Sequence, residues 1–107
     1  MFSKELPLTE AVYYILLSLR HENHGYGIIQ EVDDLTKGRV KLGPGTLYGA
    51  MQTMEKKGWI TVISQDEASR KKKDYLITDL GRGIFGEETE RLNELIENGK
   101  LMKGESK

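Results

Sequence analysis

Apolar residues recur at helical spacing in four stretches of the chain, and a short β-type region separates the third from the fourth. The first stretch spans residues 8–20, where Thr9 can act as an N-cap. Residues 21–25 interrupt it, and a second helical stretch follows over residues 26–35. The apolar stripes that we expect to face the core are Leu8, Val12, Ile15, Leu16 and Leu19 in the first stretch, and Ile28, Ile29, Val32 and Leu35 in the second.

The third stretch, residues 43–58, carries helix signals at both ends. Pro44 suits the first helical position, and Gly58 can adopt the left-handed conformation that closes many helices. Leu47, Met51 and Met54 form one apolar stripe. The other side bears the side chains of Tyr48, Gln52, Thr53 and Lys56. A short helix with polar groups, an aromatic ring and a cation on its outer face is suited to a groove of DNA.

The β-type region predicts an antiparallel hairpin, with strands over residues 59–65 and 74–77 and a basic turn between them. Trp59 is expected to pack under this hairpin. Thr78 can cap a last helix that reaches to about residue 99. The sequence therefore predicts a mainly α fold with a small β-hairpin. Its expected parts are a winged helix-turn-helix over residues 1–77, a C-terminal dimerisation helix over 78–99 and a flexible tail over 100–107.

Composition narrows the function classes. The chain of 107 residues is 37% hydrophobic with a mean hydropathy of −0.52, which suits one domain with a modest core. Because it has no cysteine, disulfides and zinc-thiolate sites are excluded. His21 and His24 adjoin a turn and lack a third ligand, so we interpret them as cap and surface residues and expect no metal or cofactor. No catalytic set, signal peptide or membrane-length apolar run is present, which predicts a cytoplasmic protein that is not an enzyme.

Charge is unevenly distributed along the chain. The net charge is −1, but residues 37–73 hold nine Lys or Arg against three acids, a local charge of +6. A cationic middle segment favours a phosphate-rich partner. A winged helix that binds a protein partner without DNA is the alternative, and the basic run could also be a solvated loop.

Four motifs resemble the PadR family of transcriptional regulators. They are residues 24–28 (HGYGI), 43–51 (GPGTLYGAM), 54–60 (MEKKGWI) and 70–81 (RKKKDYLITDLG). The resemblance extends from about residue 8 to residue 99. It implies a homodimer that presents both central helices to double-stranded DNA at a pseudo-palindromic operator. It also implies repression relieved by a small aromatic or lipophilic effector, although a dimer without any effector stays open.

The winged-helix interpretation assigns roles to particular residues. Leu47, Met51 and Met54 would anchor the central helix, together with Ala50, against the first two helices. The residues expected to contact DNA are Lys41, Gly45, Thr46, Tyr48, Gln52, Thr53, Lys56, Arg70, Lys71, Lys72 and Lys73. Tyr48 could instead be a packing residue, and Gln52 and Lys56 part of a solvated face. The residues expected to dimerise are Phe85, Leu92, Leu95 and Ile96, with docking on the chain's own first helix as the alternative.

Overall fold

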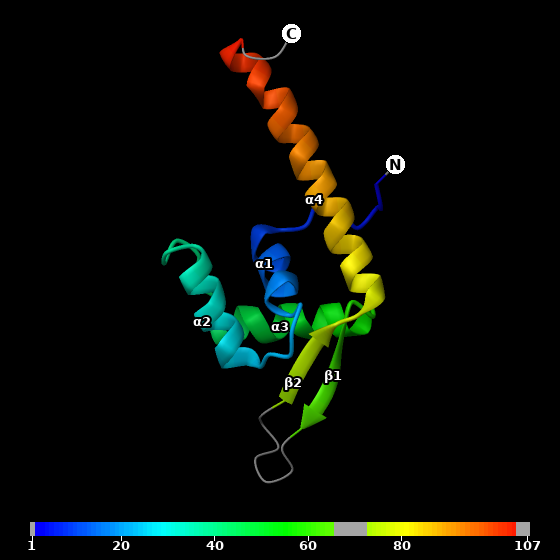
Figure 1. Ribbon diagram of the computed structural model, residues 1–107. Helices are drawn as coiled ribbons and strands as arrows, with labels where there is room; N and C mark the ends of the chain where they lie inside the picture. Colours follow the sequence, from blue (N-terminus) through cyan, green and yellow to red (C-terminus); the bar gives the residue numbers. More distant parts are fainter. Residues whose placement is uncertain (1, 66–72, 105–107) are drawn as a thin grey trace.

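A computed structural model describes residues 2–65 and 73–104 of the chain (Figure 1). Helices α1 (Glu10–Ser18), α2 (Gly25–Leu35) and α3 (Pro44–Lys56) are followed by strands β1 (Ile60–Gln65) and β2 (Lys73–Ile77). Helix α4 (Asp79–Gly99) then runs into a short 3-10 helix, η1 (Lys100–Lys103), in a segment expected to be frayed. Three helices, a hairpin and a long last helix form a winged helix-turn-helix with a C-terminal extension, which confirms the predicted fold class.

Local chemistry places the helix ends where the sequence predicts them. The Thr9 hydroxyl accepts a hydrogen bond from the Val12 amide, and the Thr78 hydroxyl accepts one from the Gly81 amide. Both threonines thus satisfy amides that have no partner within their helices. Pro44 occupies the first turn of α3, and Gly58 takes a left-handed φ of 80° just after that helix ends.

The core lies between the first three helices and the base of the hairpin. Ile15 and Leu16 of α1, and Leu19 just after its end, are fully buried, as expected, and Trp59 is only 6% exposed. The remaining core residues are Ile28, Val32, Leu42, Leu47, Met51, Met54, Ile60, Tyr75, Ile77 and Ile84. The expectation that Leu35 faces this core is wrong, because its side chain is 48% exposed. It is the last residue of α2, whose end projects beyond the neighbouring helices (Figure 1).

The hairpin is tied to the helix-turn-helix through main-chain hydrogen bonds. Strands β1 and β2 pair antiparallel, with Ile60 opposite Ile77 and an irregularity between Val62 and Ser64. In the turn between α1 and α2, the Asn23 amide donates to the Tyr75 carbonyl at 3.1 Å, and the Tyr75 amide donates back at 2.8 Å. These bonds fix β2 against the α1–α2 turn, and with it the position of the hairpin relative to α3.

Helix α4 is divided into a docked half and a projecting half (Figure 1). Near its start, the ring of Phe85 stacks on Tyr13 of α1 at 4.3 Å between centroids, and the Thr89 and Tyr13 hydroxyls are 2.7 Å apart. Further along, Leu95 and Ile96 are 52% and 59% exposed. The molecule measures 60 × 30 × 21 Å because this second half leaves the body. The first half of α4, with Phe85, therefore docks on α1 of its own chain, which was the alternative, whereas Leu95 and Ile96 in the second half are exposed.

Candidate nucleic-acid interface

The outer face of α3 is open along its length. Leu47, Met51 and Met54 point into the core, so the intervening residues are turned outward by the helical period. Of the side chains expected to contact DNA, Thr46, Gln52, Thr53 and Lys56 are exposed, and Tyr48 is 50% exposed. Gly45 lies in the exposed first turn, where amides have no partner inside the helix. The helix thus presents amide, hydroxyl, phenol and ammonium groups on one surface.

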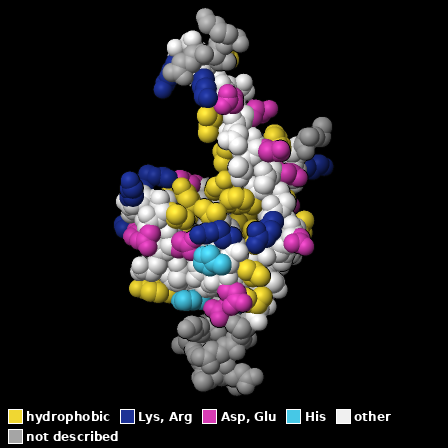
Figure 2. Space-filling model, in the orientation of Figure 1, with side chains coloured by type: hydrophobic (Ala, Val, Ile, Leu, Met, Phe, Trp, Pro, Cys, Tyr) yellow, Lys and Arg dark blue, Asp and Glu magenta, His cyan; other side chains and the backbone are white. Residues whose placement is uncertain are grey.

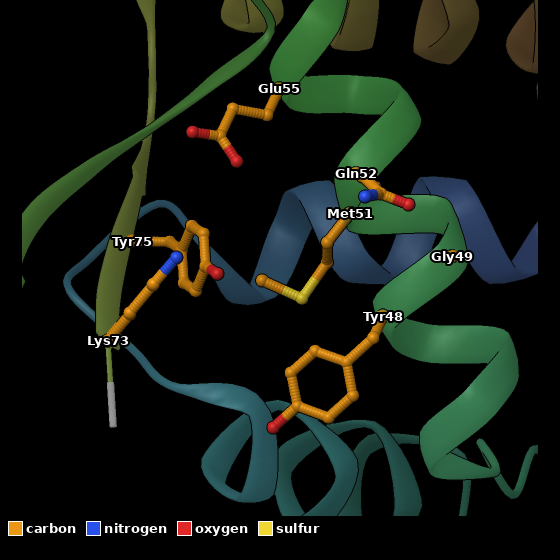
Figure 3. A pocket seen from close by; sticks show the side chains of 7 residues that line it. All are labelled: Tyr48, Gly49, Met51, Gln52, Glu55, Lys73 and Tyr75. Atoms are coloured by element: carbon orange, nitrogen blue, oxygen red, sulfur yellow. The ribbon is translucent and has the colours of Figure 1, made fainter. Parts of the chain in front are cut away.

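A shallow groove of about 300 Å³ separates α3 from β2 (Figure 3). Tyr75 lies at its base, and burial raises the pKa of its phenol, helped by the nearby carboxylate of Glu55. The phenol therefore stays neutral at ordinary pH. The groove brings residues expected to bind DNA from two elements to one place. Its lining is Tyr48, Gly49, Met51, Gln52, Glu55, Lys73 and Tyr75.

Tyr48 is both a packing residue and an exposed one. A Cβ atom added to Gly25 at the start of α2 would lie 2.1 Å from the Tyr48 hydroxyl oxygen. The tyrosine therefore lies directly over the first turn of α2, and the glycine leaves room for it. Its remaining exposed half faces outward beside the groove (Figure 3). The two alternatives for Tyr48 turn out to be compatible, since contact with α2 fixes the ring that α3 presents.

Ion pairs reduce the positive charge that a count over residues 37–73 suggests. Arg39 pairs with Glu10, Lys41 pairs with Asp33 at 2.8 Å, and Lys57 pairs with Glu5 at 2.9 Å. All three acids come from the acidic first third of the chain. In addition, the loop after α2 lies at the end of that helix far from the hairpin (Figure 1). The cationic middle of the sequence is therefore not one cationic surface.

Two lysines remain on the α3–β2 side of the described chain. Within residues 2–65 and 73–104, Lys56 and Lys73 form no ion pair; Lys56 is exposed and Lys73 is half-buried at the start of β2. Arg70, Lys71 and Lys72, also expected to contact DNA, lie outside the described residues. Lys41 is 75% exposed, so its ammonium group is accessible despite its pairing with Asp33.

Sequence reasoning missed three side chains beside this surface. Glu55, three positions after Gln52, lines the groove. It was not assigned to the surface because only cations and neutral polar groups were expected to contact DNA. Tyr26 and Gln30 lie on α2, where the Gln30 amide donates to the Tyr26 hydroxyl at 3.0 Å. Tyr26 is 66% exposed and follows Gly25, the residue that Tyr48 covers. The signal was present in the sequence, since Tyr26 lies off the apolar stripe of its helix.

The described residues hold neither a metal cluster nor a membrane span. Among residues 2–65 and 73–104, no three His, Cys, Asp or Glu side chains are grouped to hold a metal ion. His21 lies 3.2 Å from Glu31, and His24 lies 3.9 Å from Asp74, so each histidine has a carboxylate partner of its own. Of the helices in the described ranges, none has the length and apolar character needed to cross a membrane.

Comparison with known proteins identifies the chain's family. Residues 14–87, which include α2, α3, the hairpin and the start of α4, match the transcriptional regulator PadR-like family. The chain belongs to this family. The resemblance in its sequence motifs is thereby confirmed. The matching family and relatives are transcriptional regulators and not enzymes.

Individual relatives agree with this assignment. A PadR-family regulator from Eggerthella lenta DSM 2243 superimposes with a TM-score of 0.74 at 26% identity, over 85% of this chain and 80% of that one. A PadR-family regulator from Clostridium difficile R20291 gives a TM-score of 0.68 at 24% identity, over 87% and 99%. The transcriptional regulator YqjI of Escherichia coli K12 is 28% identical over 78 residues, 73% of this chain. The chain spans only 36% of the length of YqjI.

Proposed function

We propose that this PadR-family chain is a homodimeric repressor that binds a pseudo-palindromic operator and is released by a small-molecule effector. The observation that carries the proposal is the exposed polar face of α3 beside the hairpin groove, in a molecule whose projecting helix exposes the apolar side chains of Leu95 and Ile96. A polar surface suits base edges and phosphates, and an exposed apolar stripe suits a second copy of the chain. Such a repressor works in the cytoplasm, where its operator is.

The DNA-binding surface combines base-reading and phosphate-binding groups. Gln52 can pair with adenine through two hydrogen bonds, while Thr46, Thr53 and the phenol of Tyr48 suit the sugar-phosphate backbone. Lys73 brings a cation to the groove, and Lys56 brings one to the exposed face of α3. Gly45 lets the first turn of α3 approach a phosphate closely. Lys41 and the basic run of Arg70, Lys71 and Lys72 complete the proposed contact set.

Dimerisation is assigned to the second half of α4. Leu95 and Ile96 are more than half exposed, and the apolar exposure continues in η1, where Leu101 is 60% and Met102 92% exposed. Leu92 and Phe85 lie further down the same helix and are partly buried. Figure 2 shows hydrophobic side chains gathered where α4 leaves the body of the molecule and recurring along it. A partner's α4 packed on this stripe would remove it from water.

A cavity between α1 and α4 is the proposed effector site. Its volume is about 320 Å³, which lies at the small end of the range for ligand pockets. Tyr13 and Tyr14 supply aromatic walls, and Arg91 brings a charged group to one side. Such a lining suits a small aromatic or lipophilic compound. The lining residues are Leu8, Glu10, Tyr13, Tyr14, Glu88, Arg91 and Leu92.

One observation favours a second function, a winged helix that binds a protein partner. Three cations of the middle segment are already paired with acids, and Glu55 adds a negative charge to the groove itself. Phosphate would meet less positive charge than the sequence suggests. A protein surface with basic groups would then fit the groove better than DNA.

Binding to duplex DNA at several salt concentrations separates the two functions. We expect tighter binding to the chain's own upstream DNA than to random duplex, with affinity falling steeply as salt rises. The double replacement of Lys56 and Lys73 with alanine should weaken binding to both duplexes. It should also flatten the plot of log affinity against log salt concentration, by up to ~0.9 in slope for each phosphate that is no longer neutralised. Lys100→Ala/Lys103→Ala, at the far end of the molecule, is the charge-matched control. Failure to bind either duplex at low salt would remove the repressor proposal and favour a protein partner.

A further inference from the structure

The segment before α1 ties two distant parts of the molecule together. We name residues 2–9 the N-terminal strap. Its Ser3 amide donates to Glu87 Oε1 at 2.8 Å, and its Leu8 amide donates to Glu88 Oε2 at 3.0 Å. Between these points, Glu5 accepts from Lys57 Nζ at 2.9 Å, just after the end of α3. The strap therefore connects the middle of α4 to the C-terminal end of α3.

Glu88 is the central group of this connection. Only 2% of it is exposed, which is unusual for a carboxylate. Its oxygens accept hydrogen bonds from Arg91 at 2.6 Å (Nε) and 2.9 Å (Nη2), in addition to the bond from the Leu8 amide. Arg91 chiefly, and then the Leu8 amide, hold the pKa of this carboxyl below its usual range against the effect of burial. The charged form of Glu88 thus holds the strap and α4 in one arrangement.

Because of the position of Glu88 along α4, its contacts affect the direction of the part of the helix that follows. On either side of Glu88, α4 is held on α1: Phe85, one turn before it, stacks on Tyr13, and the Thr89 hydroxyl, just after it, lies 2.7 Å from the Tyr13 hydroxyl. From Glu88 to Gly99 the helix continues for 11 residues (99 − 88), a length of about 16 Å at 1.5 Å per residue. Tilting that length by about 15° moves its end by about 4 Å, roughly one base-pair step of 3.4 Å. In a dimer joined through α4, a small tilt at Glu88 would therefore shift the two α3 helices relative to each other by about one base pair.

We propose that Glu88 is a positioning residue that acts through the N-terminal strap: it fixes the direction in which α4 leaves the DNA-binding part, and so sets the separation of the two recognition helices in the dimer. The spacing role rests on the proposed homodimeric repressor, whereas the fixing of α4 within one chain does not. The strap links Glu88 to the end of α3 through Glu5 and Lys57, and its Leu6 and Leu8 side chains pack against the core.

Distances measured between α3 and α4 within one chain test the first part. Because the chain has no cysteine, the double replacement Thr53→Cys/Glu94→Cys accepts two spin labels at exposed positions. Doubly labelled chains diluted into excess unlabelled protein report the intramolecular distance by pulsed dipolar spectroscopy. The test variants are Glu88→Gln, which removes the charge but keeps the size, and Glu5→Ala/Glu87→Ala, which removes two of the strap's three attachments and leaves the bond between the Leu8 amide and Glu88 in place. The control is Glu97→Gln, which breaks an exposed pair with Lys100 on the same helix.

Operator spacing tests the second part with the unlabelled proteins. Operators are first selected from random DNA with the unmodified protein. Their two half-sites are then placed at the separation found in the selection, and at separations one base pair longer and one base pair shorter. We expect a single narrow distance and a strong spacing preference for the unmodified chain and for Glu97→Gln. Glu88→Gln and Glu5→Ala/Glu87→Ala should broaden the distance distribution and lose the spacing preference, while retaining binding to one half-site.

The outcomes separate cleanly. Narrow distances in both test variants would overturn the positioning role of Glu88. Broadened distances with an unchanged spacing preference would overturn its effect on the operator. If the unmodified chain bound no DNA, the proposed function and the spacing role would both fail, yet the distance distributions would still show whether Glu88 fixes α4. Because Glu5→Ala/Glu87→Ala leaves the buried ion pair intact, a folding defect in Glu88→Gln alone cannot decide the result.

Discussion

Gly81 and Gly83 form a natural pair for a stability experiment. Both lie in the first turns of α4, two positions apart. A Cβ atom on Gly81 would meet the Trp59 carbonyl oxygen at 2.2 Å and Ile77 Cγ1 at 2.8 Å, whereas one on Gly83 would meet nothing within 4 Å. Replacing each with alanine therefore keeps the chemistry constant and changes only the space around the added methyl group.

The two replacements should have opposite signs. Gly83→Ala gains about 1 kcal/mol of helix propensity. Gly81→Ala gains the same amount, but it forces apart backbone atoms that cannot rotate away as a side chain could, at about 1–3 kcal/mol, and disturbs the Thr78 amide bond to the Trp59 carbonyl, about 1 kcal/mol more. The difference between the variants should be about 2–4 kcal/mol. At about 4–8 °C per kcal/mol this separates their melting temperatures by roughly 8–32 °C.

Thermal unfolding followed by circular dichroism, at one protein concentration, measures this difference. The concentration must be fixed because unfolding of a dimer depends on it. We expect the melting temperature of Gly83→Ala to be higher than that of the unmodified protein and the melting temperature of Gly81→Ala to be lower. Equal melting temperatures would refute the reasoning, since the close approach of α4 to the Trp59 carbonyl would then not constrain residue 81.

Three further predictions concern the proposed surfaces and the buried Glu88. Gln52→Ala should relax the base preference in a selection from random DNA while leaving the salt dependence unchanged; an unaltered preference would remove Gln52 from base reading. Ile96→Asp should give monomers in sedimentation, whereas Asn98→Asp, which adds the same charge about half a turn away, should remain dimeric; two dimeric variants would place the interface elsewhere. Because the pKa of Glu88 is lowered in the folded chain, its ionised carboxylate stabilises the fold at pH values above the ordinary pKa of glutamate. This contribution is lost as the pH falls through the lowered pKa. Glu88→Gln should therefore be less stable at neutral pH and lose less stability on acidification, by denaturant titration; parallel curves would contradict the assignment.

Sequence periodicity was sufficient for the elements and most of the core. Ile15, Leu19, Met51 and Met54 are buried as their spacing requires, because a helix of 3.6 residues per turn leaves no other face for them. Leu35 fits the same period and is nevertheless exposed. Periodicity assigns a residue to a face, but where that face ends depends on the length of the neighbouring helices.

Charge was the least reliable guide to the surface. Adding the charges of residues 37–73 treats them as neighbours, yet Arg39, Lys41 and Lys57 are each paired with an acid from an earlier part of the chain. Glu55, inside the same segment, lies in the groove. Ion pairs join residues far apart in sequence, so a local sum cannot anticipate them.

The sequence by itself determined the family, the order of the elements and the face that α3 turns outward, since these follow from motifs, caps and helical spacing. Only the tertiary structure decided why Gly25 and Gly81 must be small, how α4 divides into a docked and a projecting half, and that Glu88 is buried beneath the N-terminal strap. These features arise where elements distant in sequence meet. Their chemistry depends on distances between atoms, which no spacing along the chain encodes.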